Sequence, residues 1–116
     1  MIRTRTLVAA LAALALSAGI ASATTYNVSV TENIFTPSTT SVHPGDVVHW
    51  TNNGATAHTV TSGTPGAPGQ VFNVTLNPGQ SFDWTCGTPP VASVTLNYQC
   101  DFHVALGMRG KLKVTR

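Results

Sequence analysis

The chain has 116 residues, of which 9% are charged and 42% are hydrophobic, and its formal net charge is +2. This length favours a single domain, and the low charge with frequent apolar residues excludes an intrinsically disordered chain. The sequence has no strongly basic stretch of the kind that indicates nucleic-acid binding, so we expect no nucleic-acid partner.

The N-terminal residues have the three parts of a secretory signal peptide. Two arginines precede an apolar segment over residues 7–20, and Ala21-Ser22-Ala23 is a typical cleavage site. The longest unbroken apolar run in this segment is too short to span a bilayer. We therefore expect residues 1–23 to be removed on export. Residues 24–116 would then form the mature domain, periplasmic or extracellular, with no transmembrane segment.

The remaining chain is dominated by an alternation of apolar and polar residues. The alternation runs through Tyr26–Thr31, Val47–Trp50, Phe72–Leu76, Val94–Cys100 and Lys111–Val114. It places one face of each segment in a core and the other in water. Pro-Gly and Asn-Gly turn signals separate these segments. Several short strands at this spacing predict an all-β fold, either a sandwich or a barrel.

Individual residues between these segments carry further expectations. Residues Ser62–Gln70 are rich in Gly and Pro, and we expect an exposed connection there. His43 precedes a Pro-Gly turn and is expected at the surface. His49 is out of phase with its strand neighbours, so we expect it to face solvent. Four aromatic residues are expected to be buried or half-buried: Trp50, Phe72, Phe82 and Trp84.

The most informative stretch runs from Cys100 to Met108 and reads C-x2-H-x4-M, with His103 as the histidine. Cys100 continues the inward phase of the strand that precedes it, and glycines at 107 and 110 loosen the backbone before the last strand. We therefore expect the thiol, the imidazole and the thioether to lie on one loop at an end of the fold.

These three side chains suggest a particular kind of metal site. A thiolate, two imidazoles and a weak axial thioether are the donor set of a blue-copper electron-transfer site. That set needs a second histidine, and His58 is the best candidate because it begins the apolar segment His58-Thr59-Val60 after a turn. Only a folded sandwich could bring His58 close to Cys100.

The sequence resembles the cupredoxins, most nearly the plastocyanin-like branch. The matching residues are Phe35-Thr36-Pro37, Pro44-Gly45-Asp46, Trp50-Thr51-Asn52, Ala57-His58-Thr59-Val60, Pro78-Gly79-Gln80-Ser81-Phe82, Tyr98-x-Cys100-x2-His103-x4-Met108 and Gly110-x-Leu112-x-Val114. The resemblance implies a Greek-key β-sandwich that binds one copper ion through His58, Cys100, His103 and Met108. It also implies that His103 is the ligand nearest solvent, within an apolar patch that meets redox partners. Phe102, Val104, Ala105 and Leu106 could supply part of that patch.

Two positions depart from the family pattern. Plastocyanins usually carry an aromatic residue, associated with a second electron route, directly before the cysteine, where this chain has Gln99. Many members carry Asn directly after the first histidine, where it braces the ligand loop. This chain has Thr59 there, so either its hydroxyl or another group must do the bracing.

The function we expect from these residues is that of an exported, monomeric electron carrier without enzymatic activity, which cycles one copper ion between Cu(II) and Cu(I). The first alternative is a periplasmic protein that binds or delivers copper with the same residues. The second is a structural sandwich closed by a Cys86–Cys100 disulfide, since two cysteines in an exported chain suggest a bond. Otherwise Cys86 is a free thiol.

Two further features bear on partners and on catalysis. The basic residues outside the signal peptide all come late in the chain, at Arg109, Lys111, Lys113 and Arg116, and could favour an acidic partner. Asp101 could act as a general base in an enzyme, but it is more simply a solvated loop carboxylate or a backbone-capping group.

Overall fold

The computed structural model describes residues 22–64 and 67–116, so the predicted signal peptide lies outside the described residues except for Ser22 and Ala23. The described strands are β1 (Thr25–Thr31), β2 (Ile34–Thr36), β3 (Thr39–Val42), β4 (Val47–Asn52), β5 (His58–Thr64), β6 (Ala67–Leu76), β7 (Ser81–Thr85), β8 (Ser93–Gln99) and β9 (Arg109–Thr115). A short 3-10 helix, η1 (Val104–Leu106), precedes β9. A search of the described residues finds no helix with the length and apolarity needed to cross a membrane.

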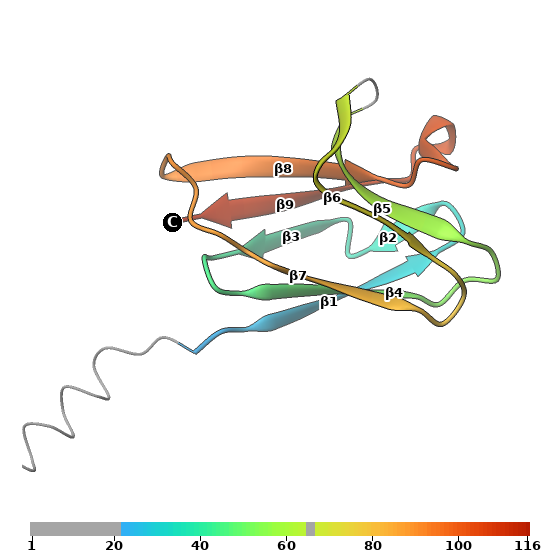
Figure 1. Cartoon of the computed structure of the whole chain (residues 1–116), viewed down its shortest axis with the longest axis horizontal. Coiled ribbons are helices and arrows are strands. Elements are labelled where there is room, and N and C mark those ends of the chain that lie inside the picture. Colours follow the sequence, from blue (N-terminus) through green and yellow to red (C-terminus); the bar gives the residue numbers. More distant parts are fainter. Residues whose placement is uncertain (1–21, 65–66) are drawn as a thin grey trace, which may run out of the picture.

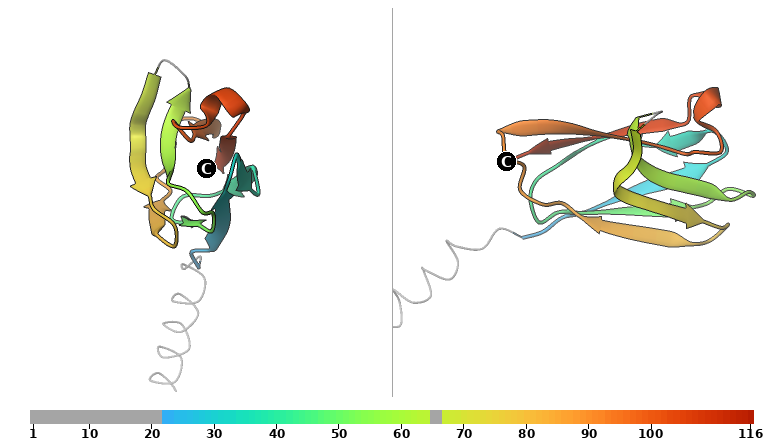
Figure 2. Two further views of the ribbon diagram at one scale, coloured as in Figure 1. Left: turned by 90° about the vertical axis from the view of Figure 1, so that its right-hand side faces the viewer. Right: turned by 45° about the horizontal axis from the view of Figure 1, so that its top comes forward.

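The strands form two sheets that face each other (Figures 1 and 2). The first sheet has the order β2-β1-β4-β7 and the second has the order β3-β9-β8-β5-β6. β1 pairs in parallel with β4 and β3 pairs in parallel with β9, while the other neighbours are antiparallel. The prediction of an all-β, single-domain Greek-key sandwich is confirmed.

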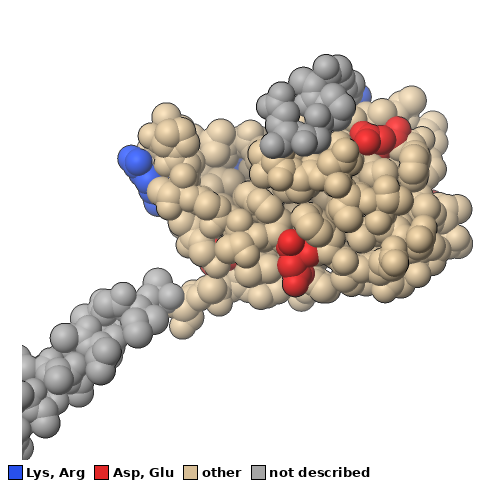
Figure 3. Space-filling model, viewed as in Figure 1, with Lys and Arg blue, Asp and Glu red and all other residues tan. Residues whose placement is uncertain are grey.

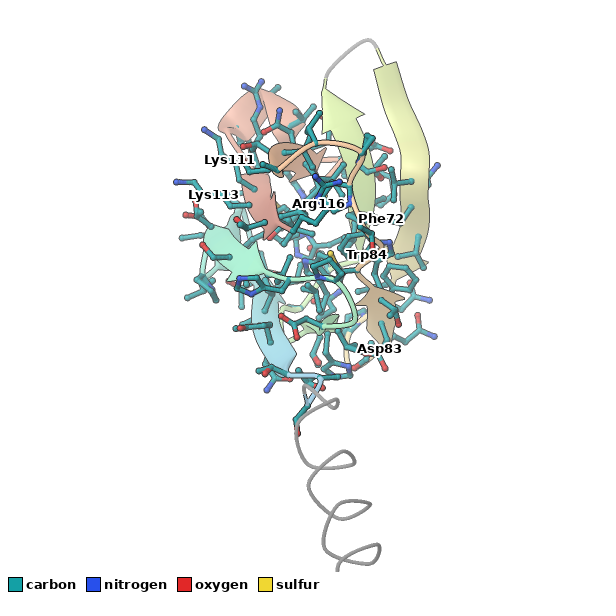
Figure 4. All side chains as sticks on the ribbon, turned by 90° about the vertical axis from the view of Figure 1, so that its left-hand side faces the viewer. Phe72, Asp83, Trp84, Lys111, Lys113 and Arg116 are labelled. Atoms are coloured by element: carbon teal, nitrogen blue, oxygen red, sulfur yellow. The ribbon has the colours of Figure 1, made fainter. Side chains whose placement is uncertain are left out.

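Aromatic side chains fill the space between the two sheets. Trp50 and Phe72 are buried with ring centroids 5.2 Å apart, and Trp50 meets Tyr98 edge-on at 5.4 Å. Phe82 and Trp84 are half-buried against this cluster, and the ring of Trp84 lies beside that of Phe72 (Figure 4). The expected burial of the four aromatic residues is confirmed. Such a core follows from alternation, since every second residue of β4 and of β9 is buried.

The expectation of an exposed connection over Ser62–Gln70 is wrong for much of that range. β5 continues to Thr64 and β6 begins at Ala67, with Gly63 opposite Pro68. Ser62 is fully buried, and its hydroxyl accepts hydrogen bonds from the N–H groups of Val71 and Phe72. The pairing shifts in register between Thr61 and Gly63, with Gly63 at a φ of 103°, and the strand continues through a Gly-containing sequence that indicated a loop.

A corner of hydrogen bonds holds the start of β1 against the turn between β3 and β4. Asp46 Oδ1 accepts the N–H of Thr24 at 3.0 Å, and Asp46 Oδ2 accepts the N–H of His43 at 2.9 Å. These backbone donors hold the pKa of the Asp46 carboxyl below its ordinary value. His43 itself is exposed, as expected. The contact between the start of β1 and this turn therefore depends on the carboxylate of Asp46, which has little contact with solvent.

Figure 3 shows few charged side chains on the face of the molecule that it presents. Lys111 and Lys113 point away from the core on β9 (Figure 4), because their neighbours in the strand are the buried residues. On the outer face of the other sheet, His49 is one-third exposed and pairs with the carboxylate of Asp83. The expectation that His49 faces outward is confirmed.

Candidate metal centre

The segment from Cys100 to Met108 forms a closed loop between β8 and β9, at the end of the sandwich that carries η1 (Figure 1). The N–H of Cys100 donates to the carbonyl of Met108 at 3.1 Å, and the N–H of Met108 donates to the carbonyl of His103 at 3.3 Å. Gly107, at a φ of 84°, makes the left-handed turn that ends η1. The loop is thus fixed by its own backbone before any metal is considered.

Three of the expected ligands converge at this loop. Cys100 Sγ lies 3.7 Å from Nδ1 of His58 and 3.5 Å from Nδ1 of His103. One donor atom from each of the three residues lies within 4.8 Å of the other two. His58 is the first residue of β5, and β5 pairs with β8, so the sheet brings it to Cys100 across a separation of 42 residues.

Met108, the fourth expected ligand, lies at the end of the same loop, and the four residues differ in burial. Met108 is fully buried at the end of the loop, as are His58 and Cys100, whereas His103 is partly exposed. His103 is therefore the member of the group nearest solvent, as the resemblance implied. Two imidazole nitrogens, a thiol and a nearby thioether residue make a donor set suited to copper.

Large apolar side chains lie exposed on the same loop. Phe102 has 59% of its surface exposed and Leu106 has 67%, and they flank His103 in the sequence. Val104 is partly exposed and Ala105 is exposed. Exposed apolar side chains therefore lie on the same loop as the partly exposed His103. We call Phe102, Val104, Ala105 and Leu106 the loop patch.

Thr59 braces the two segments by hydrogen bonds, one of the two possibilities that the sequence left open. Its backbone N–H donates to Cys100 Sγ at 3.4 Å, and its hydroxyl accepts the N–H of Asp101 at 2.7 Å. The hydroxyl of Thr61 donates to that of Thr59 at 3.0 Å. Hydrogen bonds to a ligand sulfur and to its neighbours fix the orientation of a ligand, and Thr59 ties together the two segments that carry the expected ligands.

Asp101 belongs to this hydrogen-bonding network. Its carboxylate accepts the side-chain amide of Gln99 at 3.0 Å, and it lies 3.1 Å from the Thr61 hydroxyl, whose one proton it shares with the Thr59 oxygen. Asp101 is exposed, so it is a solvated loop carboxylate, as the simpler interpretation held. Gln99, at the position of the missing aromatic residue, is buried and serves this network.

Sequence reasoning missed two residues that shape the segment before His58. The side-chain amide of Asn52, which is buried, donates to the carbonyls of Thr56 and Leu76, both at 2.8 Å, and its oxygen accepts the N–H of Gly54. The matching motif Trp50-Thr51-Asn52 includes this residue, but a sequence motif does not show its hydrogen bonds.

Glu32 is the second missed residue. Its Oε1 accepts the N–H of Ala55 at 2.7 Å and the N–H of Thr56 at 3.1 Å, and it lies 3.5 Å from Nε2 of His58. The bond from Ala55, with the other backbone donors, lowers the pKa of Glu32 to about 2. No local pattern around Glu32 indicated this contact.

Cys86 is a free thiol, and so is Cys100. Cys86 follows β7, which ends at the end of the sandwich opposite η1 (Figure 1). Burial, with a contribution from the Asp46 carboxylate, raises the pKa of the Cys86 thiol. The Cys86–Cys100 disulfide of the second alternative is therefore not formed in this structure, and the Cys100 sulfur is available to a metal.

Comparisons with known proteins agree with this arrangement. The sequence model of a family described as copper binding proteins, plastocyanin/azurin family, matches residues 22–115. Among solved structures, a purple cupredoxin from Nitrosopumilus maritimus is similar in fold, with a TM-score of 0.65 and 23% identity over 78% of this chain and 99% of that chain. A mutant fern plastocyanin has a TM-score of 0.59 and 29% identity over 77% of this chain and 99% of that one. A reduced amicyanin mutant has a TM-score of 0.60 and 27% identity over 84% and 87%, respectively.

Proposed function

Because this chain belongs to the plastocyanin/azurin family of copper-binding proteins, which bind one copper ion, we propose that it is a type 1 copper protein that carries single electrons between redox partners. His58, Cys100, His103 and Met108 hold the ion in this proposal. The observation that carries it is the convergence of three donor side chains from two separate segments: the buried His58 and Cys100 and the partly exposed His103.

When bound, copper supplies one-electron exchange between Cu(II) and Cu(I). The residues of the chain keep the donor positions fixed during that exchange. Cys100 is held by the N–H of Thr59 and by the carbonyl of Met108, and His58 is held in the first position of a paired strand. A site fixed by backbone hydrogen bonds rearranges little when an electron arrives, which favours fast transfer.

The proposed docking surface is the loop patch around His103. Of the four expected ligands, His103 is the one whose side chain is partly exposed, and Phe102 and Leu106 add exposed apolar surface on the same loop. The protein acts as a monomer in this proposal and meets its partners briefly. Lys111 and Lys113, exposed on β9, would favour a partner with acidic groups.

The alternative of copper delivery would use the same four residues. A delivery protein must release its ion to a second protein, which needs donors that the second protein can reach. Three of the four residues are fully buried here, which supports the electron carrier. We also propose that the chain acts after export and removal of residues 1–23, since proteins of this family are typically exported.

The test is the visible spectrum of residues 24–116, reduced, stripped of metal and given one equivalent of Cu(II). We expect an intense thiolate-to-copper charge-transfer band that is lost in Cys100→Ser and retained in Cys86→Ser. Reversible oxidation and reduction without loss of copper would support the carrier, and transfer of copper to an acceptor without redox cycling would support delivery. A colourless wild-type protein would contradict both.

A further inference from the structure

We infer that Glu32 is a positioning residue for the proposed copper ligand His58, whose ring it holds with Nδ1 toward Cys100. This inference rests on the proposed function, because it takes His58 as a ligand. Glu32 lies far from the ligands in the sequence, on the turn between β1 and β2, and neither the motif comparison nor the family match assigns it a role.

The turn that carries Glu32 is placed over the segment before His58. Thr31 pairs with Ile34, which leaves Glu32 and Asn33 as a two-residue connection, with Asn33 at a φ of 67°. Asn tolerates this left-handed conformation better than most residues. The N–H of Asn53 donates to the carbonyl of Val30 at 2.8 Å. The hairpin and residues 53–57 are therefore joined by backbone as well as by Glu32.

The carboxylate of Glu32 is surrounded by three hydrogen-bond donors and by a glycine that has no side chain to displace it; we call this arrangement the cradle. Oε1 of Glu32 accepts the N–H groups of Ala55 and Thr56 and, at 3.3 Å, the hydroxyl of Thr56. A Cβ atom at Gly54 would lie 2.5 Å from the same oxygen. Glycine at 54 therefore leaves the space that the carboxylate occupies. Although Glu32 is half exposed, these hydrogen bonds fix the position of its carboxylate.

The hydrogen bonds of the cradle place the carboxylate beside Nε2 of His58, on the edge of the ring that points away from Cys100. Nε2 of His58 lies 3.5 Å from Glu32 Oε1 and 3.4 Å from the Thr56 hydroxyl, while Nδ1 lies 3.7 Å from Cys100 Sγ. A carboxylate can only accept a hydrogen bond, so it favours the proton on Nε2. Nδ1 then carries no proton, and its free lone pair, which a metal ligand needs, lies on the side of the ring that contacts Cys100.

With a metal bound to Nδ1, the carboxylate, the histidine and the metal would form a chain of contacts. In such chains the carboxylate fixes the orientation of the ring and makes it a stronger donor. His58 is fully buried, so protein groups rather than bulk water decide its tautomer. Loss of the carboxylate should weaken metal binding roughly 10- to 100-fold, the usual effect of removing such a partner. It should also raise the reduction potential, since a nearby anion stabilises Cu(II) more than Cu(I).

The experiment compares Glu32→Gln and Gly54→Ala with the wild type. Glu32→Gln removes the charge and keeps the size, while Gly54→Ala displaces the carboxylate and leaves it in the protein. The control is Asp83→Asn, which removes an equal charge from a carboxylate–histidine pair on the outer face of the sheet. Thermal unfolding of the metal-free proteins shows whether each variant folds.

Two readouts distinguish positioning from a merely structural role. Nitrogen NMR of the histidine rings in the metal-free and Zn(II)-loaded proteins reports the tautomer of His58 without any redox activity. Voltammetry of the copper-loaded proteins gives the potential. We expect an Nε2-protonated ring in the wild type and in Asp83→Asn. We expect a mixed or exchanging signal, weaker Zn(II) binding and a higher potential in Glu32→Gln, with a shift in the same direction in Gly54→Ala.

The failure of this inference differs from that of the proposed function. If the wild type shows the charge-transfer band but folded Glu32→Gln matches Asp83→Asn in ring signals, Zn(II) affinity and potential, the role of Glu32 is refuted and the copper site stands. If the wild type shows no band, the proposed function is refuted, and a role for Glu32 in copper binding is refuted with it.

Discussion

The hydroxyl of Thr59 accepts the backbone N–H of Asp101 at 2.7 Å, so the residue after His58 is bonded directly to the residue after Cys100. This one contact couples β5 to the loop that carries the other expected ligands. The same hydroxyl also accepts the hydroxyl of Thr61. Removal of the Thr59 hydroxyl should therefore change the stability of the protein.

We predict that Thr59→Val destabilises the metal-free protein by about 1–3 kcal/mol, because it removes the buried hydroxyl that accepts the N–H of Asp101. Thr59→Ser keeps the hydroxyl and is the matched control. Urea unfolding followed by tryptophan fluorescence measures the difference. Equal unfolding midpoints for the two variants would show that the hydrogen bond contributes nothing.

We predict that Asn52→Ala destabilises the protein by at least about 2 kcal/mol, since it removes the buried partner of two carbonyls and one N–H. The adjacent Asn53→Ala is the control, because that side chain is exposed and bonds only to the hydroxyl of Ser29 among the described residues. Its effect should stay within about 0.5 kcal/mol. Thermal unfolding of both variants provides the comparison, which a similar loss in Asn53→Ala would contradict.

The outcome of sequence reasoning differed between the strands. The longer alternating segments, such as the one ending in β8 and the one in β9, were predicted because period two is visible within a single segment. β2 and β3 are only three and four residues long and show too little of that period. The extension of β5 past Ser62 was missed because a register shift and a buried serine depend on the neighbouring strand.

The candidate site divides in the same way. Cys100, His103 and Met108 lie on one short segment, so spacing alone suggested a shared site, and His58 followed from its place at the start of a strand. Asn52 and Glu32 act on that site through hydrogen bonds across turns. The residue types involved are common in turns, and only the folded chain shows which donors surround them.

We predict that Gly110→Ala is strongly destabilising, by about 2 kcal/mol or more, because the added methyl group would collide with the ring of Tyr98 in the aromatic core. Gly87→Ala is the control. A Cβ at Gly87 meets no atom within 4 Å, and the backbone there has an ordinary φ. Thermal unfolding should place Gly87→Ala at or above the wild type. A wild-type melting temperature in Gly110→Ala would contradict the prediction.

We predict that Leu106→Glu slows electron self-exchange between the copper-loaded proteins by at least about tenfold, since facing like charges across the contact costs more than ~1.4 kcal/mol. Val91→Glu is the control, because Val91 is also exposed, at 53% against 67% for Leu106, but lies between β7 and β8. NMR line broadening in mixtures of the two oxidation states gives the rate. Equal slowing in both variants would show that the loop patch is not the docking surface.

We predict a loss of stability in acid that depends on Asp46. The folded protein lowers the pKa of this carboxyl, so its contribution is complete above about pH 4, near the unfolded value, and is lost as the pH falls through the folded value. Asp46→Asn should therefore be less stable than the wild type at pH 7 and lose less on acidification from pH 5 to 2. Urea unfolding across this range measures both, and parallel curves would contradict the prediction.

The bond between Thr24 and Asp46 has a consequence for protein export. If residues 1–23 are removed as the sequence predicts, the nitrogen that lies 3.0 Å from Asp46 Oδ1 changes from an amide into a positively charged terminal amine. Cleavage would then create an ion pair at the base of β1 that the precursor lacks. The chain beginning at Thr24 should resist heat better than one beginning at Ser22, and Asp46→Asn should abolish that difference. Cleavage before Thr24 would thus also stabilise the folded protein.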